Sequence, residues 1–405
     1  MRTPPRPPLL FLSWESPWPA HSGAALRTLG LLSELGRRYS VDLVVLTRRE
    51  LPDETLAQLS DLAQNVTQLR LRDVSISDKL RALRWIVGRR YPYHSAILEG
   101  SLAEAPAVRR KIKDFPGVVF TSIGHWGTLI RDRPSSNWVL NQCDADVEFW
   151  KVYASQNPNP LARWAARLNY LLARIHYPRV YAHAGRVISV CEEDRRGTRA
   201  LAPRARVEVI ENGIDCSTYV PHRSPRTGPP RLLFTGTSTA RNMTALRRLV
   251  KNVLPLILSE VPEAELLVGG DFSAEAQVRF AGIPALRFTG RIDDMRPVFD
   301  QSDVFLAPFE ETHGSKLKIA EAMAMGMAIV SSPAGIRGFS LTDGESVLVA
   351  HDDRQFASLA VGLLRSAAER ERIGAAARDV ALRTIDWAVL RKKLFRIIDA
   401  TRPEK

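Results

Sequence analysis

The chain has 405 residues, 45% of them apolar and 25% charged, with a formal net charge of +13. This length exceeds what one ordinary hydrophobic core serves and predicts two domains, and the composition is that of a folded protein. No apolar run approaches the roughly eighteen residues that a membrane-spanning helix needs. The excess positive charge indicates an anionic partner, and three classes fit: a nucleic acid, a membrane surface or a phosphorylated substrate.

The chain begins with a basic, proline-rich segment that runs into the apolar residues Leu9–Ser13. Because prolines interrupt this segment and no plausible cleavage site follows, we expect a first buried strand there. The three cysteines, Cys143, Cys191 and Cys216, lack metal-ligand spacing and leave one residue unpaired in any disulfide scheme. A reducing cytosol is the simplest setting, so we expect a cytoplasmic protein.

Short apolar runs alternate with helical patterns along most of the chain. Short strands separated by helices of roughly ten to fifteen residues are typical of parallel βαβ sheets. The strands predicted in the first half are Leu9–Trp14, Asp42–Thr47, Val66–Arg72, Val118–Ser122, Trp138–Cys143, Arg186–Cys191 and Val207–Ile210. Those predicted in the second half are Arg231–Gly236, Ala264–Gly269, Leu286–Gly290, Asp303–Ala307, Ala328–Ser332 and Ser346–Ala350.

The two halves are separated by residues 221–230, which are rich in proline and polar residues and resemble a linker. We therefore predict an α/β protein with two Rossmann-like, doubly wound domains, residues 1–222 and 223–385. Residues 386–405 contain an amphipathic helix that we expect to pack across the domains. Ligands bind at the carboxyl ends of the strands in such sheets, so a cleft between the two sheets is the expected site.

The most informative segment is 313–332, which follows one apolar run and ends in another. Its order predicts strand, glycine turn, helix and strand. A helix N-terminus offers unpaired amides and a positive dipole end to a phosphate. Lys318 and Glu321 are three residues apart and share one helix face. The cation can meet a diphosphate while the carboxylate accepts hydrogen bonds from sugar hydroxyls, which indicates a nucleotide-sugar site.

Several short motifs occur in an order that resembles one family. They are the turn 19–23 followed by Arg27, the segment 211–215, Phe234–Gly236 followed by Asn242, the segment 288–294, and the helix 321–326. Over nearly its whole length the chain resembles the retaining glycosyltransferases of family 4, also called group 1, which have the two-domain GT-B fold. It is similar to bacterial exopolysaccharide sugar transferases. The resemblance implies an acceptor-binding N-terminal domain and a C-terminal domain that binds a nucleoside-diphosphate sugar.

The chain departs from the family pattern at one of its two signature glutamates. Glu321 matches the second, which in the family holds the nucleotide ribose. His313 stands at the first position, where the family's glutamate contacts the donor sugar, and is a candidate catalytic residue here. Glu310 and Glu311 lie nearby and are candidates to replace the missing first glutamate. Relatives that lack the first glutamate keep a glycine and a lysine, which match Gly314 and Lys318.

The family's basic pair after the first strand of the C-terminal domain is also altered, because Thr237 replaces an arginine and Arg241 stands near the usual lysine. The candidate cations for the diphosphate are then Arg241, Lys316 and Lys318. We expect the loop 290–294 near the base. The predicted donor-binding residues are Gly23, Arg241, Arg291, Gly314, Ser315, Lys316, Lys318 and Glu321.

His125 and Asp144 follow predicted strands and complete the candidate catalytic set. A histidine at a strand end suits proton transfer, although a structural role is the commoner one. Asp144 is a candidate for orienting an acceptor hydroxyl. Asp144-Ala-Asp146 is more often a turn and helix cap than a metal site, and Asp293-Asp294 likewise favours helix capping. We therefore predict catalysis without a metal and without a cofactor, with the nucleotide sugar as substrate.

The span from Phe149 to Cys191 contains no acidic residue, and the segment 79–90 is basic and amphipathic. Both fall in the half that the resemblance assigns to the acceptor, a glycan or a polyprenyl-linked sugar. Two interpretations stay open: peripheral docking on the anionic inner face of the membrane, and a solvated basic face. No recognised nucleic-acid module accompanies the charge, so we predict no nucleic-acid partner.

Two other functions compete with sugar transfer. A nucleotide-sugar epimerase of the same fold would convert its substrate without an acceptor. A basic adaptor with no enzymatic activity would keep its cellular function after Glu321→Ala. A nicotinamide enzyme is disfavoured because no G-x-G-x-x-G turn follows any predicted strand.

Overall fold

A computed structural model describes residues 6–20, 22–71, 83–84, 86–103, 105–130, 137–142, 146–156, 159–222, 228–310 and 314–402. Its contacts divide the chain into two compact units. Unit 1 comprises Met1–Ile210 and Arg391–Lys405, and unit 2 comprises Glu211–Leu390. The expected linker near residue 225 includes residues 223–227, which lie outside the described residues.

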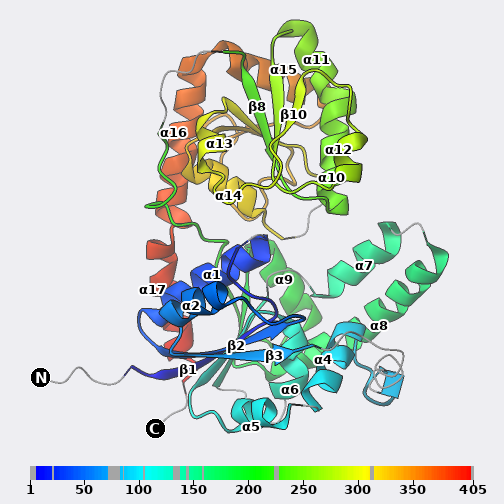
Figure 1. The fold of residues 1–405 in the computed structure, drawn as a ribbon, viewed down its shortest axis with the longest axis vertical. Coiled ribbons are helices and arrows are strands. Elements are labelled where there is room, and N and C mark those ends of the chain that lie inside the picture. Colours follow the sequence, from blue (N-terminus) through cyan, green and yellow to red (C-terminus); the bar gives the residue numbers. More distant parts are fainter. Residues whose placement is uncertain are drawn as a thin grey trace, which may run out of the picture. The chain divides into compact units, whose positions relative to one another are not determined.

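Unit 1 is built on a seven-stranded parallel sheet with the strand order β3-β2-β1-β4-β5-β6-β7 (Figure 1). All seven strands predicted for this half are present, with ends that differ by at most two residues. They are β1 (Pro8–Ser13), β2 (Ser40–Thr47), β3 (Asn65–Arg70), β4 (Val118–Thr121), β5 (Trp138–Asn141), β6 (Arg186–Ser189) and β7 (Val207–Val209).

Both faces of this sheet are buried. Along β1, Leu10 and Leu12 join one apolar cluster, while Phe11 packs on the other face, 4.9 Å from the ring of Phe120. Successive side chains of a strand point to opposite faces, so a strand covered on both sides is apolar throughout. This is why β1 appears in the sequence as an unbroken apolar run.

Helices of unit 1 connect the strands on both faces of the sheet. Right-handed crossovers place the first two on one face and the others on the opposite face, because the strand order reverses after β3. They are α1 (Gly23–Gly36), α2 (Asp53–Leu62), α4 (Tyr93–Ala103), α5 (Pro106–Asp114), η1 (Gly124–Trp126), α6 (Gly127–Ile130), α7 (Asp146–Gln156), α8 (Pro160–His183) and α9 (Glu192–Leu201).

The C-terminal helix α17 (Trp387–Asp399) corresponds to the helix predicted there, and its residues from Arg391 onward belong to unit 1. Arg391 pairs with Glu34 of α1. The Tyr39 hydroxyl donates to Asp399 Oδ1 at 2.9 Å. These contacts attach the end of the chain to the surface of α1 and the start of β2.

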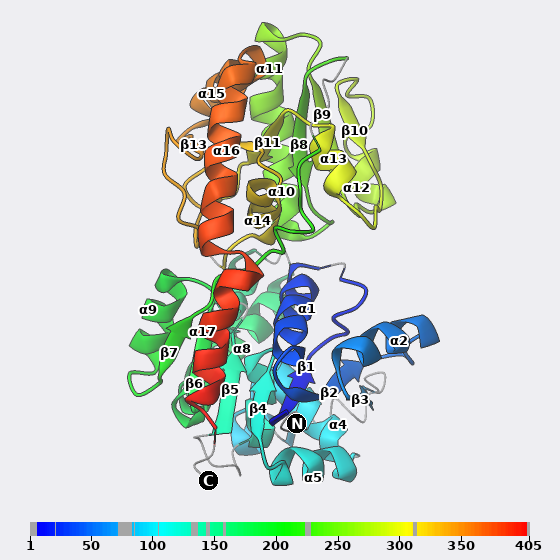
Figure 2. The ribbon, with the colours of Figure 1, turned by 90° about the vertical axis from the view of Figure 1, so that its left-hand side faces the viewer.

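Unit 2 contains a six-stranded parallel sheet with the order β10-β9-β8-β11-β12-β13 (Figure 2). The six strands predicted for this half are all present. They are β8 (Arg231–Thr235), β9 (Glu265–Gly269), β10 (Leu286–Phe288), β11 (Val304–Ala307), β12 (Ala328–Ser331) and β13 (Leu348–Val349). The two parallel sheets confirm the predicted α/β class.

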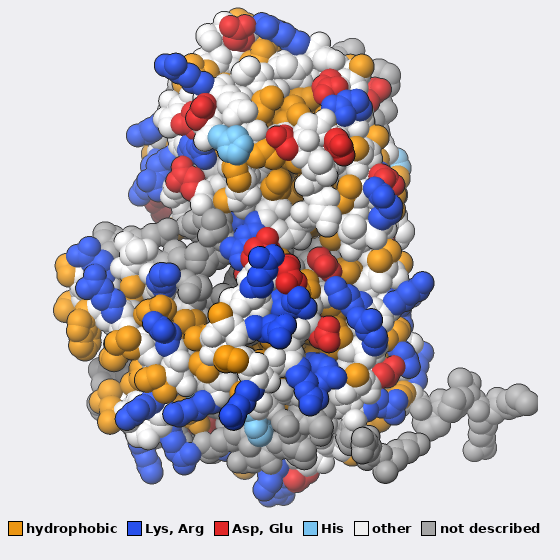
Figure 3. Space-filling model, turned by 180° about the vertical axis from the view of Figure 1, so that it is seen from behind, with side chains coloured by type: hydrophobic (Ala, Val, Ile, Leu, Met, Phe, Trp, Pro, Cys, Tyr) orange, Lys and Arg blue, Asp and Glu red, His pale blue; other side chains and the backbone are white. Residues whose placement is uncertain are grey.

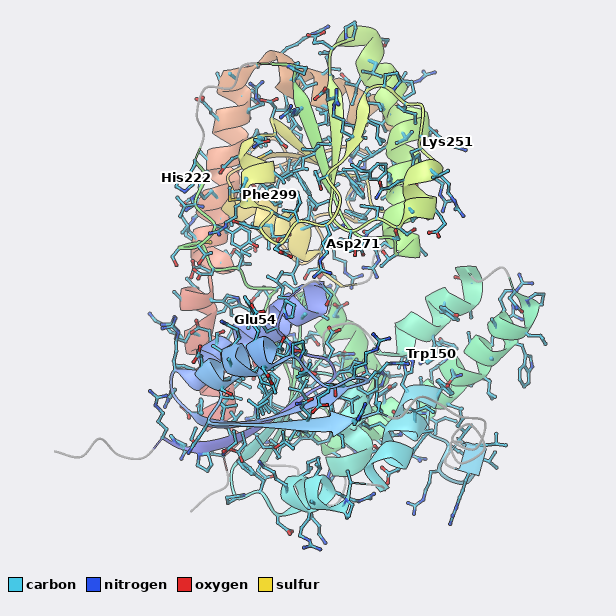
Figure 4. The ribbon with its side chains drawn as sticks, in the orientation of Figure 1. Glu54, Trp150, His222, Lys251, Asp271 and Phe299 are labelled. Atoms are coloured by element: carbon cyan, nitrogen blue, oxygen red, sulfur yellow. The ribbon has the colours of Figure 1, made fainter. Side chains whose placement is uncertain are left out.

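The helices of unit 2 cover both faces of its sheet. They are α10 (Ala240–Arg248), α11 (Leu254–Glu260), α12 (Ala274–Val278), α13 (Arg296–Asp300), α14 (Leu317–Ala324), α15 (Asp353–Arg365) and α16 (Ala367–Thr384), with a π-helical stretch η3 (Leu249–Val253) between α10 and α11. Figure 4 labels Phe299 on α13, which packs 5.8 Å from the ring of Phe305 in the core.

Strand β8 lies next to β11, and the chain runs outward from this pair in both directions. This is the topological switch point, where the carboxyl ends of strands form a crevice. Helix α14, which follows β11, is packed closely by α16: a Cβ on Gly374 would lie 2.0 Å from the Gly326 carbonyl oxygen. None of the helices in the described ranges has both the length and the apolar character needed to span a bilayer.

Candidate functional site

The candidate site lies at the carboxyl ends of β8 and β11. After β8 the chain turns at Gly236 and enters α10, whose N-cap is Thr239. After β11 it runs through Gly314, which has a φ of 59°, and enters α14 at Leu317. The side chain of the α14 N-cap residue makes no capping hydrogen bond, so the first amides of this helix face the crevice without a side-chain cap.

Lys318 is fixed beneath the turn that follows β8. Its Nζ donates to the Thr235 carbonyl oxygen and, at 2.9 Å, to Asn242 Oδ1. The ammonium also lies over the rings of Phe234 and Phe309, 5.2 and 5.0 Å from their centroids. An ammonium has three N–H donors, so one is left for a ligand.

Two more cations lie close enough to act on Lys318. Burial is the main cause that lowers the pKa of Lys318 to about 7; Glu321 acts against it, and Arg241 and Lys316 lower it further. Lys316 is itself buried, and its Nζ lies 5.9 Å from the Phe309 ring centroid. The predicted cations Arg241, Lys316 and Lys318 therefore form one cluster, in which repulsion favours an anionic ligand.

Glu321 is held by Tyr219, a residue that the sequence analysis did not select. The Tyr219 hydroxyl donates to Glu321 Oε1 at 3.1 Å. Burial raises the pKa of Glu321, while the Tyr219 hydrogen bond and the charge of Lys318 lower it in part. The second carboxylate oxygen has no hydrogen-bond partner among the described residues and can accept from a ligand.

Arg378 of α16 fixes the backbone that carries Tyr219. Its guanidinium donates to the carbonyl oxygens of Tyr219 at 2.6 Å and Cys216 at 3.3 Å, and also to that of Ala324 at the end of α14. A single planar cation thus joins the turn 216–219 to the helix of Glu321. Sequence reasoning missed Tyr219 and Arg378, because nothing local marks either residue.

The turn 314–316 is tied to a second predicted motif. Asn212 Nδ2 donates to Ser315 Oγ at 2.7 Å and to the Ser315 carbonyl oxygen at 3.2 Å. Gly314, Ser315 and Lys316 therefore have a defined position before α14. Arg291 stands on an exposed loop after β10, where its Nε is 3.9 Å from Asp293 Oδ1.

The glycines beneath these residues allow a close approach of two strand ends. A Cβ on Gly270, which has a φ of 112°, would lie 2.1 Å from the Gly236 carbonyl oxygen. A Cβ on Gly236 would lie 2.8 Å from Asn242 Nδ2 and 3.2 Å from Lys318 Nζ. The position of Lys318 therefore depends on these turns having no side chain. Figure 4 labels Asp271, which directly follows Gly270 at the end of β9.

In unit 1, Gly23 is the first residue of α1. Ser22 caps this helix by accepting from the Ala25 amide at 3.0 Å. The guanidinium of Arg27, which is buried, donates to Asn141 Oδ1 at 2.9 Å and to the Ile210 carbonyl oxygen at 2.9 Å. The motif residue Arg27 thus joins α1 to the ends of β5 and β7.

His125 lies in a buried cluster of rings. Its Nδ1 is 2.6 Å from the Tyr177 hydroxyl, and its ring packs 4.8 Å from Trp14 and 5.0 Å from His94. Burial, followed by His94 and His176, lowers the pKa of His125 well below its usual range. His125 is therefore neutral at pH 7.

The other candidate residues have different outcomes. Asp144, Glu311 and His313 lie outside the described residues. Glu310 is described and pairs with Arg248 at 3.7 Å.

Comparison with known proteins defines the class of this fold. HepE from Anabaena, whose structure was solved with UDP and glucose, superposes with a TM-score of 0.66 at 13% identity, covering 97% of this chain and 100% of that one. The sucrose-phosphate synthase from Thermosynechococcus elongatus superposes with a TM-score of 0.69 at 15% identity, covering 96% of this chain and 98% of that one. The chain has the GT-B fold, with two Rossmann-like domains.

Sequence comparison finds similarity over part of the chain. Residues 229–366 match the family model described as Glycosyl transferases group 1. The phosphatidyl-myo-inositol mannosyltransferase of Mycobacterium tuberculosis is 31% identical over 204 residues, which cover 47% of this chain and 53% of the relative. The chain thus spans about half the length of the curated relatives it matches. Together these matches show that the part of the chain covering residues 229–366 is similar to the group 1 glycosyltransferases.

Proposed function

We propose that the protein is a retaining glycosyltransferase that moves a sugar from a nucleoside-diphosphate sugar to a glycan or a lipid-linked acceptor. Synthesis of an exopolysaccharide or another cell-surface glycan is the process we assign to it. The observation that carries the proposal is the pairing, on helix α14, of Lys318 inside a cation cluster with Glu321 fixed by Tyr219. The mannosyltransferase relative supports sugar transfer, and HepE, whose structure was solved with UDP and glucose, supports a nucleotide-linked donor.

The cation cluster suits the leaving group of such a reaction. Breaking the bond between the anomeric carbon and the phosphate oxygen leaves negative charge on the diphosphate and positive charge on the sugar. Arg241, Lys316 and Lys318 would neutralise the diphosphate, aided by the first amides of α14. Because Lys318 is fixed by hydrogen bonds before the donor binds, its reorganisation during charge development is small. We propose that the three cations do this without a metal ion.

Glu321 is suited to bind the ribose hydroxyls of the donor nucleotide. Its free carboxylate oxygen can accept hydrogen bonds from two neighbouring hydroxyls, while Tyr219 fixes its other oxygen. A carboxylate with one oxygen held in place loses less side-chain entropy on binding. Arg291 and its loop are placed near the base in this proposal.

The chemical step has a simple balance. The donor loses its C1–O bond to the diphosphate, and an acceptor hydroxyl forms a new C1–O bond on the same face. The hydroxyl proton passes to the departing diphosphate oxygen, so the configuration at C1 is retained. We assign His313 to the donor sugar, and His125 and Asp144 to the acceptor side. For His125 this role is one of orientation, because its Nδ1 already bonds to Tyr177.

Product analysis tests the proposal. The protein is incubated with UDP-, GDP- or dTDP-linked hexoses, with and without a panel of oligosaccharide and polyprenyl-phosphate sugar acceptors, and the products are examined by NMR. The expected result is a new glycosidic bond with the donor's anomeric configuration, formed only with acceptor and lost in Glu321→Gln. Conversion of the sugar without acceptor would identify an epimerase, and an inverted product would refute retention.

A further inference from the structure

Helix α8 of unit 1 presents a row of large apolar side chains to solvent. Leu161, Trp164, Leu168, Leu171 and Ile175 follow one another at spacings of three and four residues, so they share one helix face. Their exposed fractions run from 37% for Ile175 to 78% for Leu161. A contiguous exposed apolar row of this length marks an interaction surface.

The charged side chains beside this apolar row are all basic. Arg163, Arg167, Arg174 and Arg179 are exposed on the same helix, and α8 contains no acidic residue. In Figure 3, apolar and basic side chains lie side by side at the left of the view, where α8 is found. Two copies of this helix packed together would bring like charges into contact, which is unfavourable. The charge pattern therefore favours an anionic surface over self-association.

A cavity of about 330 Å³ lies at the C-terminal end of α8. Its walls include Arg89, Arg90 and Arg179, and also Ile175, the last member of the apolar row. Since each water molecule occupies about 30 Å³ in the liquid, the space holds on the order of ten waters, enough for a phosphate group with its first substituents. The apolar row thus ends at a basic cavity.

Two buried polar atoms in residues that line the cavity have no hydrogen-bond partner among the described residues. They are Thr128 Oγ1 and His176 Nε2, in residues only 1% and 8% exposed. Buried polar atoms normally have partners, because an unmade hydrogen bond costs about 1–3 kcal/mol. Burial, followed by the charge of Arg179, lowers the pKa of His176 to about 4, so this ring is neutral at pH 7. An anionic oxygen in the cavity would accept from the arginine side chains that line it.

We propose that α8 docks unit 1 on an anionic lipid bilayer, with the apolar row in the headgroup boundary and one lipid phosphate in the cavity. Trp164 and Leu171 enter the boundary, and Arg90 and Arg179 pair with the phosphate. The proposal goes beyond sugar transfer and uses no donor-site residue. A thermal shift with UDP, GDP or dTDP tests the donor site separately in each variant.

Vesicle sedimentation of the full chain tests this surface. Vesicles are made of phosphatidylcholine alone or of phosphatidylcholine and phosphatidylglycerol in equal parts. We expect binding to the second kind only, reduced about twenty-five-fold in Arg90→Gln/Arg179→Gln, since each basic residue near an anionic surface contributes about 1 kcal/mol, or about fivefold. The double variant Trp164→Ala/Leu171→Ala should reduce binding to the phosphatidylglycerol vesicles about tenfold or more, because less apolar surface is buried.

Matched controls separate docking from general charge and folding. Arg204→Gln removes an exposed arginine of unit 1, and Val278→Ala removes an apolar side chain that is 72% exposed in unit 2; both should bind as the unaltered protein does. Equal binding to both vesicle types, no binding to either, or unaltered binding by the α8 variants would overturn the proposal. So would a dimer in light scattering that Trp164→Ala/Leu171→Ala dissociates, or inorganic phosphate binding in the cavity without any vesicle binding.

Discussion

Lys318 is expected to gain a proton when a nucleoside diphosphate binds. Burial lowers the pKa of this ammonium to about 7, so at pH 8 about nine-tenths of it is neutral in the free protein. A diphosphate beside it favours the charged form. Lys318 should therefore take up about 0.9 proton on binding at pH 8 and about 0.1 at pH 6, provided that the bound complex keeps it fully protonated.

The affinity should change with pH in the same sense. Because the protonated form binds, the dissociation constant is nearly constant below pH 7 and rises towards about tenfold per pH unit above it. Isothermal titration with UDP, GDP or dTDP at pH 8, in buffers of different ionisation enthalpy, gives the proton uptake directly. The terminal phosphate of the ligand has a pKa near 6 and contributes little at pH 8.

Lys318→Arg is the matched control, because an arginine keeps its charge at every pH used and takes up no proton. Its heat of binding should not depend on the buffer. If the unaltered protein at pH 8 also gave a heat independent of the buffer, with equal affinity at pH 6.5 and pH 8.5, the assigned role of Lys318 would be wrong.

The remaining predictions concern the parts of unit 2 that hold the site. Tyr219→Phe leaves one Glu321 oxygen unpaired and should weaken nucleotide binding about tenfold, measured by titration, with little change in circular dichroism. Arg378→Met removes three carbonyl contacts and should lower the free energy of unfolding by about 1–3 kcal/mol in urea, together with nucleotide affinity. Gly270→Ala should destabilise more than Gly282→Ala, because both have positive φ but only the first Cβ meets backbone atoms.

The lowered pKa of Lys318 also predicts how the free energy of unfolding depends on pH. Its folded-state pKa lies below its unfolded-state pKa, so the unfolded chain binds more protons between about pH 7 and pH 10.5. The contribution of Lys318 to the free energy of unfolding therefore rises with pH across that window. Urea titrations of the unaltered protein and of Lys318→Met at several pH values measure it, and an identical pH slope in both proteins would contradict the prediction.

The strands could be predicted because both faces of each parallel sheet are covered. Leu9, Leu10, Phe11 and Leu12 are all fully buried, so β1 stands out as a continuous apolar run between polar residues. Strand ends are less marked in the sequence. Strand β10, for example, ends at Phe288, two residues before the predicted end.

Local spacing alone predicts the candidate site only where its residues are close in the chain, and Arg241 is predicted through the family resemblance instead. Lys318 and Glu321 share one helix, so their spacing alone places them together. Tyr219 lies 102 residues before its partner Glu321, and Arg378 lies 159 residues after Tyr219. Contacts over such separations follow from tertiary packing and leave no local pattern. The same holds for His125, whose partner Tyr177 is 52 residues away.

Nucleotide-sugar binding by unit 2 tests the central claim most directly. The unaltered protein and Glu321→Ala are heated with UDP-, GDP- and dTDP-linked sugars, and their unfolding temperatures are compared. At a hundredfold excess over the dissociation constant a ligand stabilises by about 2.7 kcal/mol, which raises the unfolding temperature by several degrees. We predict such a rise with at least one donor, reduced or lost in Glu321→Ala. No rise with any donor, or an equal rise in both proteins, would contradict the assignment of Lys318 and Glu321 to a donor site.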